Sequence, residues 1–197
     1  MSQEQIIRII LLGYSDVGKT TILRHGFDKG SPGMLSTIGI DFRSKYFNFD
    51  NSKIKVNYID TAAQEKFRSI SLNFLRGKDG AMFVYDVSKR ETYELIWQWL
   101  DDIKENNEMN IGKILVGNKV DLESKREVSK EEGEQLAEAL QCKYYEISAK
   151  TGLNINEVID EIARISYLKW KKDPEKRNSI RISSIDFNGK EKKNCCK

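Results

Sequence analysis

Residues Gly13–Thr20 read GYSDVGKT and have the pattern GxxxxGK[ST]. They follow an apolar run, Gln5–Leu12, that is typical of a buried strand, and a helical pattern comes after them. In such a loop, successive backbone N–H groups form a nest for an anion at the start of a helix. Lys19 would reach the β- and γ-phosphates of a nucleotide, and the Thr20 hydroxyl would bind Mg²⁺. We therefore predict a nucleotide-phosphate site here, with the Asp16 carboxylate turned to solvent.

Strand and helix patterns alternate on both sides of this loop. The predicted strands are Gln5–Leu12, Phe42–Asn48, Lys53–Asp60, Ala81–Asp86, Lys113–Asn118 and Lys143–Ile147, the second and third forming a hairpin about Asp50–Ser52. The predicted helices after the loop's own helix are Glu91–Glu105, Ser129–Leu140 and Ile155–Lys172, and Ser129 with Glu132 forms a capping box. The order predicts a three-layer α/β fold: a six-stranded, mostly parallel sheet with one antiparallel hairpin strand and helices on both faces.

Charge is unevenly placed along the 197 residues, which carry 33 Lys+Arg and 30 Asp+Glu. The last 25 residues, Asp173–Lys197, hold seven basic and four acidic side chains, so the net charge of +3 lies there and residues 1–172 are formally neutral. We expect a domain over 1–172 and a flexible tail over 173–197. A neutral body argues against a nucleic-acid partner, and no apolar run predicts a membrane span or signal peptide.

A phosphate loop alone leaves ATPases, nucleotide kinases and GTPases open. Three later segments follow strand ends, where open α/β sheets bind ligands: DTAAQE at Asp60–Glu65, GNKVD at Gly117–Asp121 and EISAK at Glu146–Lys150. A carboxylate such as Asp121 accepts from both N1–H and the 2-amino group of guanine, whereas adenine offers neither donor there. Asn118 would brace the site, and the Lys119 stem would cover the base. The pattern favours guanine.

These motifs, in this order and at this spacing, resemble the Ras superfamily of small GTPases over about residues 5–170, and the Rab family in particular. The Rab-like stretches are TIGIDF at Thr37–Phe42, KFRSI at Lys66–Ile70 and FVYDVS at Phe83–Ser88. The resemblance implies a P-loop GTPase fold and a nucleotide site built from Ser15, Asp16, Val17, Gly18, Lys19, Thr20, Thr21, Thr37, Ala63, Asn118, Lys119, Asp121, Ser148, Ala149 and Lys150.

The resemblance also implies phosphoryl transfer from GTP to water, giving GDP and phosphate. Thr20 and Thr37 would hold Mg²⁺, with Asp60 acting through a water, and Gln64 would orient the attacking water. No arginine finger is evident in the chain, so fast hydrolysis would need a GTPase-activating protein. Loss of the γ-phosphate would release two loops, roughly 31–42 and 62–75. The other implied partners are an exchange factor, a GDP-dissociation inhibitor or escort protein, and effectors that contact Ile38, Gly39, Ile40, Asp41, Phe42, Ile59, Phe67 and Phe74.

Three positions depart from the family pattern. Ala63 stands where the family usually has Gly, and its Cβ either slows hydrolysis or is accommodated by its neighbours; both interpretations stay open. The segment from Lys19 to Thr37 is one position shorter than is common, without the aromatic that stacks on guanine, which predicts weaker nucleotide retention. Phe27 either replaces that aromatic or packs in the core, and we favour the core. Ile59 replaces a usual Trp, which predicts an atypical effector set.

The tail ends in Asn194, Cys195, Cys196 and Lys197. This ending resembles the CCX terminus of Rab proteins, in which both thiols receive geranylgeranyl groups. Two lipid chains give stable anchoring where one is marginal, and the tail lysines add attraction to an anionic leaflet. The resemblance implies a protein anchored to the cytosolic face of internal membranes, with a cytosolic pool. The alternative is two free thiols on a loose tail.

We therefore predict a Rab-like switch that cycles between GTP and GDP to regulate vesicle transport. One alternative is a GTP-loaded adaptor with strongly impaired hydrolysis because of Ala63; a less favoured one is a P-loop kinase for a small metabolite. We assign structural roles to the remaining singular residues: His25, Trp99 and Trp170, and Cys142 as a buried thiol at a strand edge. We expect Glu131 and Glu132 on a solvated helix face.

Overall fold

The computed structural model describes residues 5–27, 41–60, 75–105 and 111–173. It contains one six-stranded sheet in the order β2-β3-β1-β4-β5-β6. The strands are β1 (Ile6–Leu12), β2 (Asp41–Phe49), β3 (Ser52–Asp60), β4 (Gly80–Asp86), β5 (Gly112–Asn118) and β6 (Lys143–Glu146), and the helices are α1 (Lys19–Phe27), α3 (Arg90–Glu105), α4 (Lys130–Ala139) and α5 (Ile155–Lys172). A 3₁₀ helix spans Val120–Lys125.

The sheet is parallel except for its first pair, as predicted. β2 and β3 are antiparallel, while β3, β1, β4, β5 and β6 run in the same direction. The hairpin turn is tighter than predicted, because only Asp50 and Asn51 leave the ladder and Ser52 already pairs with Phe49. Both turn residues have positive φ, 46° and 62°. Such a two-residue turn matches the twist of the strands it joins, which is why Asp and Asn are favoured there.

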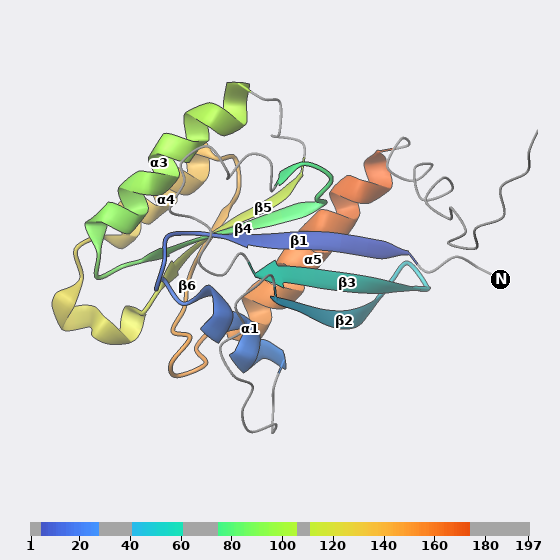
Figure 1. Ribbon diagram of the computed structural model, residues 1–197, viewed down its shortest axis with the longest axis horizontal. Helices are drawn as coiled ribbons and strands as arrows, with labels where there is room; N and C mark the ends of the chain where they lie inside the picture. The colour runs from blue at the N-terminus through green and yellow to red at the C-terminus, as the bar shows by residue number, and fades with distance from the viewer. Residues whose placement is uncertain (1–4, 28–40, 61–74, 106–110, 174–197) are drawn as a thin grey trace, which may run out of the picture.

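The helices cover both faces of the sheet (Figure 1). Residues of α1 and α5 form one core with β1, β3, β4 and β5, including Ile22, Ile159 and Ile162. The other face packs against α3 and α4 through residues such as Trp99 and Leu136. This arrangement confirms the three-layer prediction. Because successive strand residues point to opposite faces, the neighbours Tyr144 and Tyr145 join different cores.

Helix α4 begins as its sequence predicts. Ser129 accepts a hydrogen bond from the Glu132 amide, and the Glu132 carboxylate accepts one from the Ser129 amide at 2.9 Å. Glu132 also pairs with Arg90 of α3 at 2.9 Å. The expectation of a solvated face is therefore wrong for Glu132, which is half-buried and joins two helices, and right for exposed Glu131.

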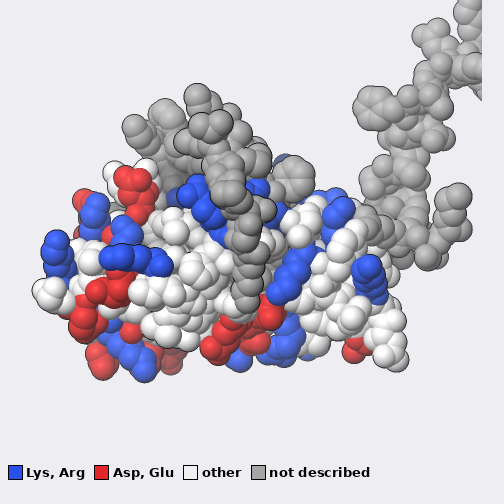
Figure 2. All heavy atoms as spheres, turned by 90° about the horizontal axis from the view of Figure 1, so that it is seen from below, with Lys and Arg blue, Asp and Glu red and all other residues white. Residues whose placement is uncertain are grey.

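Trp99 and Trp170 are buried in the two cores, as expected. None of the described helices has a stretch long and apolar enough to cross a bilayer. On the face shown in Figure 2, Lys and Arg side chains lie interspersed with Asp and Glu. This mixture agrees with the equal numbers of basic and acidic side chains in residues 1–172.

Helix α5 approaches the sheet very closely at Ser166, where two strands begin with glycine. A Cβ on Gly80 would lie 2.0 Å from the Ser166 hydroxyl oxygen. A Cβ on Gly112 would lie 2.7 Å from both the Cα and the amide nitrogen of Ser166. The absence of side chains at these two strand starts therefore sets the distance between α5 and the sheet.

We expect Gly112→Ala to lower the free energy of unfolding by about 1–3 kcal/mol, because the new methyl group can be accommodated only by moving α5. Urea unfolding measures the change. In a Ser166→Ala background, Gly80→Ala should lose most of its penalty, since its worst contact is the hydroxyl oxygen. Gly112→Ala should keep most of its penalty there, because two of its three nearest contacts are backbone atoms of Ser166 and only the third is the hydroxyl oxygen. Equal rescue of both variants would contradict this explanation.

Candidate functional site

The ends of the parallel strands bring the predicted motifs to one edge of the sheet. The Gly13–Thr20 loop follows β1, Asp60 ends β3, and Asn118 ends β5. Ser148 lies just beyond β6. Since β3, β1, β4, β5 and β6 are parallel neighbours, four segments far apart in sequence meet at their carboxyl ends.

The loop after β1 has room for glycine alone at two places. A Cβ on Gly13 would lie 2.1 Å from the Val84 carbonyl oxygen of β4. Gly18 has φ +99°, and a Cβ there would lie 2.5 Å from the Asn118 amide nitrogen. The loop is thus pressed against β4 and the end of β5, which keeps its backbone close to the other segments of the site.

Lys19 is buried inside this loop, although a charged lysine side chain is ordinarily exposed to solvent. Its side chain is only 5% exposed, and its ammonium donates to the Gly13 and Tyr14 carbonyls at 2.7 and 2.9 Å. The ammonium is therefore positioned beside the loop by hydrogen bonds of the protein itself.

The carboxylate of Asp16 is exposed, as predicted for a side chain that avoids the phosphate nest. Asp16 has φ +64°, a conformation that short polar residues tolerate better than most. Ser15 is half-buried, Val17 is buried, and Thr21 is exposed on α1. The backbone of the loop, together with Lys19 and Thr20, is therefore the part of the nest that the sequence pattern assigns to an anion.

Thr20 and Asp60 meet as expected of residues that share a cation. The Thr20 hydroxyl donates to Asp60 Oδ2 at 2.5 Å, and Asp60 is 1% exposed. A hydroxyl and a carboxylate are hard oxygen donors of the kind Mg²⁺ prefers, and they lie next to the phosphate loop. The donor set therefore fits Mg²⁺. The third predicted ligand, Thr37, lies outside the described residues.

Asn118 links the phosphate loop to the segment after β6. Its amide donates to the Val17 carbonyl at 2.7 Å, and its oxygen accepts from the Ala149 amide at 2.9 Å. The side chain is 1% exposed, so both backbone groups depend on it for their hydrogen bonds. The predicted bracing role of Asn118 has this geometric basis.

Asp121 is oriented by the segment after β6. The Ser148 hydroxyl donates to Asp121 Oδ1 at 2.6 Å and accepts from the Thr151 amide at 3.1 Å. The Lys150 ammonium lies 3.9 Å from Asp121 Oδ2. One carboxylate oxygen is thus fixed by a hydroxyl, which sets the direction in which Asp121 accepts other hydrogen bonds.

Asp86 is a residue of the site that the sequence reasoning missed. It ends β4, is 1% exposed, and pairs with the Lys119 ammonium at 2.6 Å. Burial alone would raise the pKa of Asp86, but hydrogen bonds from Lys119 and Ser88 hold it below its usual value. Ser88 donates to it from its amide and its hydroxyl, at 2.9 and 2.6 Å. An Asp at a strand end followed two residues later by Ser is a weak sequence signal of such a turn.

We expect Asp86→Asn to lower the free energy of unfolding by about 1–3 kcal/mol and to weaken guanine-nucleotide binding about tenfold, because the Lys119 ammonium loses its anion. Urea unfolding and nucleotide titration measure the two effects. Since the pKa of Asp86 is lowered in the folded state, the pair stabilises the fold above the ordinary Asp value of 3.8 and loses its effect as the pH falls below it.

Adding Lys119→Met to Asp86→Asn provides the control. The double variant should recover stability, because no unpaired charge remains, without recovering nucleotide affinity. Recovery of both properties would show that the pair has only a structural role.

Several predicted residues fall outside the described part of the chain. They are Thr37, Ile38, Gly39, Ile40, Ala63, Gln64, Phe67, Phe74, Cys195 and Cys196. Asp41 and Phe42 belong to β2, where Phe42 is the Cα partner of Ile59. Ile59 is partly buried and packs against the core of α3 and α4. The register thus places Phe42 and Ile59, two of the eight expected effector positions, side by side.

Phe27, His25 and Cys142 were expected to have structural roles, and the structure shows the environment of each. The Phe27 ring lies edge-on to Tyr58 with centroids 5.1 Å apart, which agrees with the core interpretation. His25 lies against Gly152, where an added Cβ would be 2.3 Å from its Nε2. Cys142 is half-buried rather than buried as expected, and burial raises the pKa of its thiol to about 12.

Comparisons with known proteins agree with this geometry. A model of the Ras family matches residues 8–167. The chain is 37% identical over 197 residues to GTP-binding protein ypt2 of Schizosaccharomyces pombe, covering 99% of this chain and 98% of the relative. It is 36% identical over 192 residues to Ras-related protein Rab-13 of Rattus norvegicus, covering 97% and 94%. It is 37% identical over 177 residues to Ras-related protein Rab-8B of Bos taurus, covering 89% and 86%.

A family match over most of the chain and near-complete coverage of these relatives lead to one conclusion. This chain belongs to the Ras family and, within it, to the Rab small GTPases, which bind and hydrolyse GTP and regulate vesicle transport.

Proposed function

We propose that the site at the carboxyl edge of the sheet binds GTP and GDP with Mg²⁺ and that its nucleotide state controls which partners the protein binds. The observation that carries this proposal is the double hydrogen bond of Asn118, which joins the phosphate loop to the segment holding Asp121. A phosphate site and a guanine-selective carboxylate are thereby kept in one rigid frame. Adenine offers no hydrogen-bond donors to that carboxylate, so the geometry favours a guanine-nucleotide switch over an adenine-nucleotide kinase.

In this proposal different residues of the chain bind the phosphates, Mg²⁺, the guanine base and the attacking water. The loop amides and the Lys19 ammonium bind the phosphates, and the protein's own hydrogen bonds orient the ammonium beforehand. Thr20, Asp60 and Thr37 would hold Mg²⁺, which would neutralise charge on the phosphates. Asp121 would accept hydrogen bonds from guanine, with Ser148 fixing its orientation. Gln64 would orient the attacking water, and Ala63 and Thr37 would sense the γ-phosphate.

Membership of the Rab family supports regulators, effectors and endomembrane association in general. We further propose that Cys195 and Cys196 carry two lipid chains and that the basic tail adds attraction to an anionic membrane. Binding positions for effectors would include the β2–β3 region around Phe42 and Ile59. The domain would span residues 1–172 and the flexible tail 173–197.

Chromatography of the nucleotide released from the purified, denatured protein tests the proposal. Bound GDP would support an active switch. Bound GTP would support an adaptor with impaired hydrolysis, and bound adenine nucleotide would refute the guanine site and favour a kinase. Mass spectrometry of the protein from eukaryotic cells would show whether the last two cysteines are lipidated.

The Ala63 position gives a direct kinetic prediction. We expect Ala63→Gly to speed single-turnover GTP hydrolysis, by about tenfold if removing the Cβ recovers one backbone hydrogen bond to the γ-phosphate in the transition state. Quench-flow measurement of phosphate release with GTP-loaded protein tests this. Equal rates for the two proteins would show that the neighbouring residues accommodate the methyl group.

A further inference from the structure

The 3₁₀ helix that carries Asp121, Val120–Lys125, is described in full, and none of its residues is buried. It is bent at Leu122, whose φ and ψ of −96° and 38° are not helical. Val120 is partly buried against the core of α3 and α4. A segment with so little apolar packing depends on hydrogen bonds and ion pairs for its position.

Arg126, the residue after this helix, joins it to the end of β6. Its guanidinium donates from Nη1 and Nη2 to the two carboxylate oxygens of Glu146, at 2.7 and 3.3 Å. It also donates from Nε and Nη2 to Glu123, three residues earlier, at 3.0 and 2.9 Å. The Arg126 and Glu146 side chains are 18% and 22% exposed. Because the pair is forked and largely shielded from water, it fixes the distance between the two segments better than an exposed pair would.

The two segments joined by Arg126 are the ones proposed to recognise guanine. Glu146 lies two residues before Ser148, whose hydroxyl donates to Asp121 at 2.6 Å. The backbone adds one further tie, from the Val120 amide to the Ile147 carbonyl at 3.2 Å. Ser148 thus orients the Asp121 carboxylate, while Arg126 holds the far end of the helix that carries it.

Glu146 is itself oriented by two tyrosines. The Tyr144 hydroxyl donates to Glu146 Oε1 at 3.0 Å, and it lies 2.7 Å from the Tyr85 hydroxyl. A carboxylate can only accept, so the single proton of Tyr144 is used on Glu146 and Tyr85 must donate to Tyr144. Tyr85, Tyr144 and Glu146 therefore form a directed relay, from β4 to the end of β6.

Two glycines make room for this relay. A Cβ on Gly117 of β5 would lie 2.7 Å from the Tyr144 hydroxyl oxygen and 3.0 Å from that of Tyr85. A Cβ on Gly133 of α4 would lie 2.4 Å from Cζ of Tyr144. Gly117 is the strand partner of Tyr85 on one side and of Glu146 on the other. The relay thus crosses β5 where a side chain is missing, one residue before Asn118.

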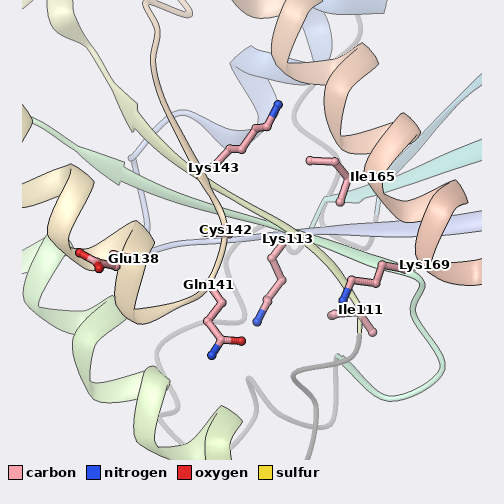
Figure 3. Close-up of a pocket in the computed structure, with 8 residues that line it drawn as sticks. All are labelled: Ile111, Lys113, Glu138, Gln141, Cys142, Lys143, Ile165 and Lys169. Carbon is pink, nitrogen blue, oxygen red and sulfur yellow. The ribbon is translucent and has the colours of Figure 1, made fainter.

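The amino end of β6 is packed less closely. It borders a pocket of about 410 Å³ whose lining includes Cys142 and Lys143 (Figure 3). The Lys143 ammonium pairs with Glu161 of α5 at 2.8 Å, in an exposed position. Since β6 has only four residues, the contacts at its carboxyl end have most influence on where Glu146 lies.

We propose that Arg126 is a positioning residue for guanine recognition. By tying the 3₁₀ helix to Glu146, it keeps the Asp121 carboxylate directed at N1–H and the 2-amino group of the base. This role rests on the proposed guanine-nucleotide site and adds a residue that sets its selectivity. Hydrogen bonds weaken steeply as their angle departs from linear, so a small rotation of the helix is enough to weaken the contact with the 2-amino group.

The ratio of GDP affinity to IDP affinity measures this positioning, because hypoxanthine is guanine without the 2-amino group. Competition with a fluorescent GDP on the full-length protein, with Mg²⁺, gives both affinities. The unmodified protein should prefer GDP by about tenfold or more, since the amino group donates to a carboxylate. We expect Arg126→Met to reduce this preference at least about threefold. Partial unfolding lowers both affinities equally, so the ratio separates positioning from a merely structural role.

Glu146→Gln tests the same tie from the other side and provides a second variant if Arg126→Met does not fold. It keeps the shape of the side chain, removes its charge, and should lower the GDP preference in the same direction. The double variant should show no smaller preference than Arg126→Met alone, because both substitutions break one interaction. Additive losses would mean that the two residues act independently, which would contradict the proposal.

Arg164→Met is the matched control. Arg164 donates from Nε and Nη2 to Glu161, three residues earlier on α5, at 2.8 and 2.7 Å, as Arg126 does to Glu123. Its loss should leave the GDP preference within about twofold of the unmodified protein. Glu123→Gln should do the same, since it leaves the tie between Arg126 and Glu146 in place.

Three results would overturn the positioning role. They are an unchanged GDP preference in folded Arg126→Met or Glu146→Gln, an equal loss in Arg164→Met, and an unmodified protein that binds IDP as tightly as GDP. Thermal unfolding with bound GDP identifies the folded variants. An unmodified protein without preference for GDP over ADP would instead refute the guanine site itself, so the two failures are distinguishable.

Discussion

Replacing Asp121 with Asn is expected to weaken GDP binding by at least about a hundredfold and to create affinity for xanthosine nucleotides. The carboxylate would accept two hydrogen bonds, from N1–H and the 2-amino group of guanine, and bonds to a charged group contribute about 1.5–3 kcal/mol each. An amide can turn a donor toward the 2-position, where xanthine has a carbonyl oxygen. Ser148 holds Asp121 at 2.6 Å, so the substituted side chain should keep the same place.

Competition between GDP and XDP for the nucleotide-free protein measures this exchange of specificity. Glu123→Gln is the matched control, since it converts a carboxylate to an amide two residues away, in the same 3₁₀ helix. Glu123 pairs with Arg126 at 2.9 Å and should leave the preference for guanine unchanged. An Asp121→Asn protein that still prefers GDP with undiminished affinity would show that this carboxylate does not contact the base.

Asn118→Ala is expected to lower the free energy of unfolding by about 2–4 kcal/mol and to speed GDP release by at least about a hundredfold. The substitution leaves the Val17 carbonyl and the Ala149 amide without their partner, and each unpaired buried group costs about 1–3 kcal/mol. It also removes the direct link between the phosphate loop and the segment that orients Asp121. Both halves of the nucleotide site should therefore loosen together.

Urea unfolding in excess GDP and stopped-flow release of a fluorescent GDP measure the two effects. Asn57→Ala provides the control, because within the described residues its side-chain oxygen accepts a single hydrogen bond, from Ser44, on the surface of the hairpin. That variant should change stability by less than about 1 kcal/mol and leave GDP release unaffected. Unchanged GDP release from Asn118→Ala would mean that the link is structural and has no part in nucleotide retention.

Local patterns in the sequence were sufficient to predict most of the fold. Helix α5 begins and ends where the apolar spacing over Ile155–Lys172 predicts, and the capping box at Ser129 forms as expected. Errors at strand boundaries are small: Ser52 belongs to β3 rather than to the turn, and Ile147 follows β6. These elements are predictable because their signals, periodicity and capping, involve residues within a few positions of each other.

The features that the sequence did not predict come from contacts between distant segments. The ion pair of Asp86 with Lys119 joins residues 33 positions apart, and no local pattern indicates it. Glu132 was expected in solvent because its helix face is polar, but Arg90 of α3 lies beside it.

The amino-acid sequence by itself determined the family and the order of strands and helices, and it predicted the phosphate loop and the guanine-selective segments. Each of these rests on short motifs or on periodic apolar residues, which can be recognised in the sequence without knowing which residues lie nearby in space. Only the tertiary structure decided how Asn118 joins two motifs and which anion Lys119 faces. The reason is physical: hydrogen bonds and charge interactions act over a few ångströms in space, and the distance between two residues along the chain says little about that separation.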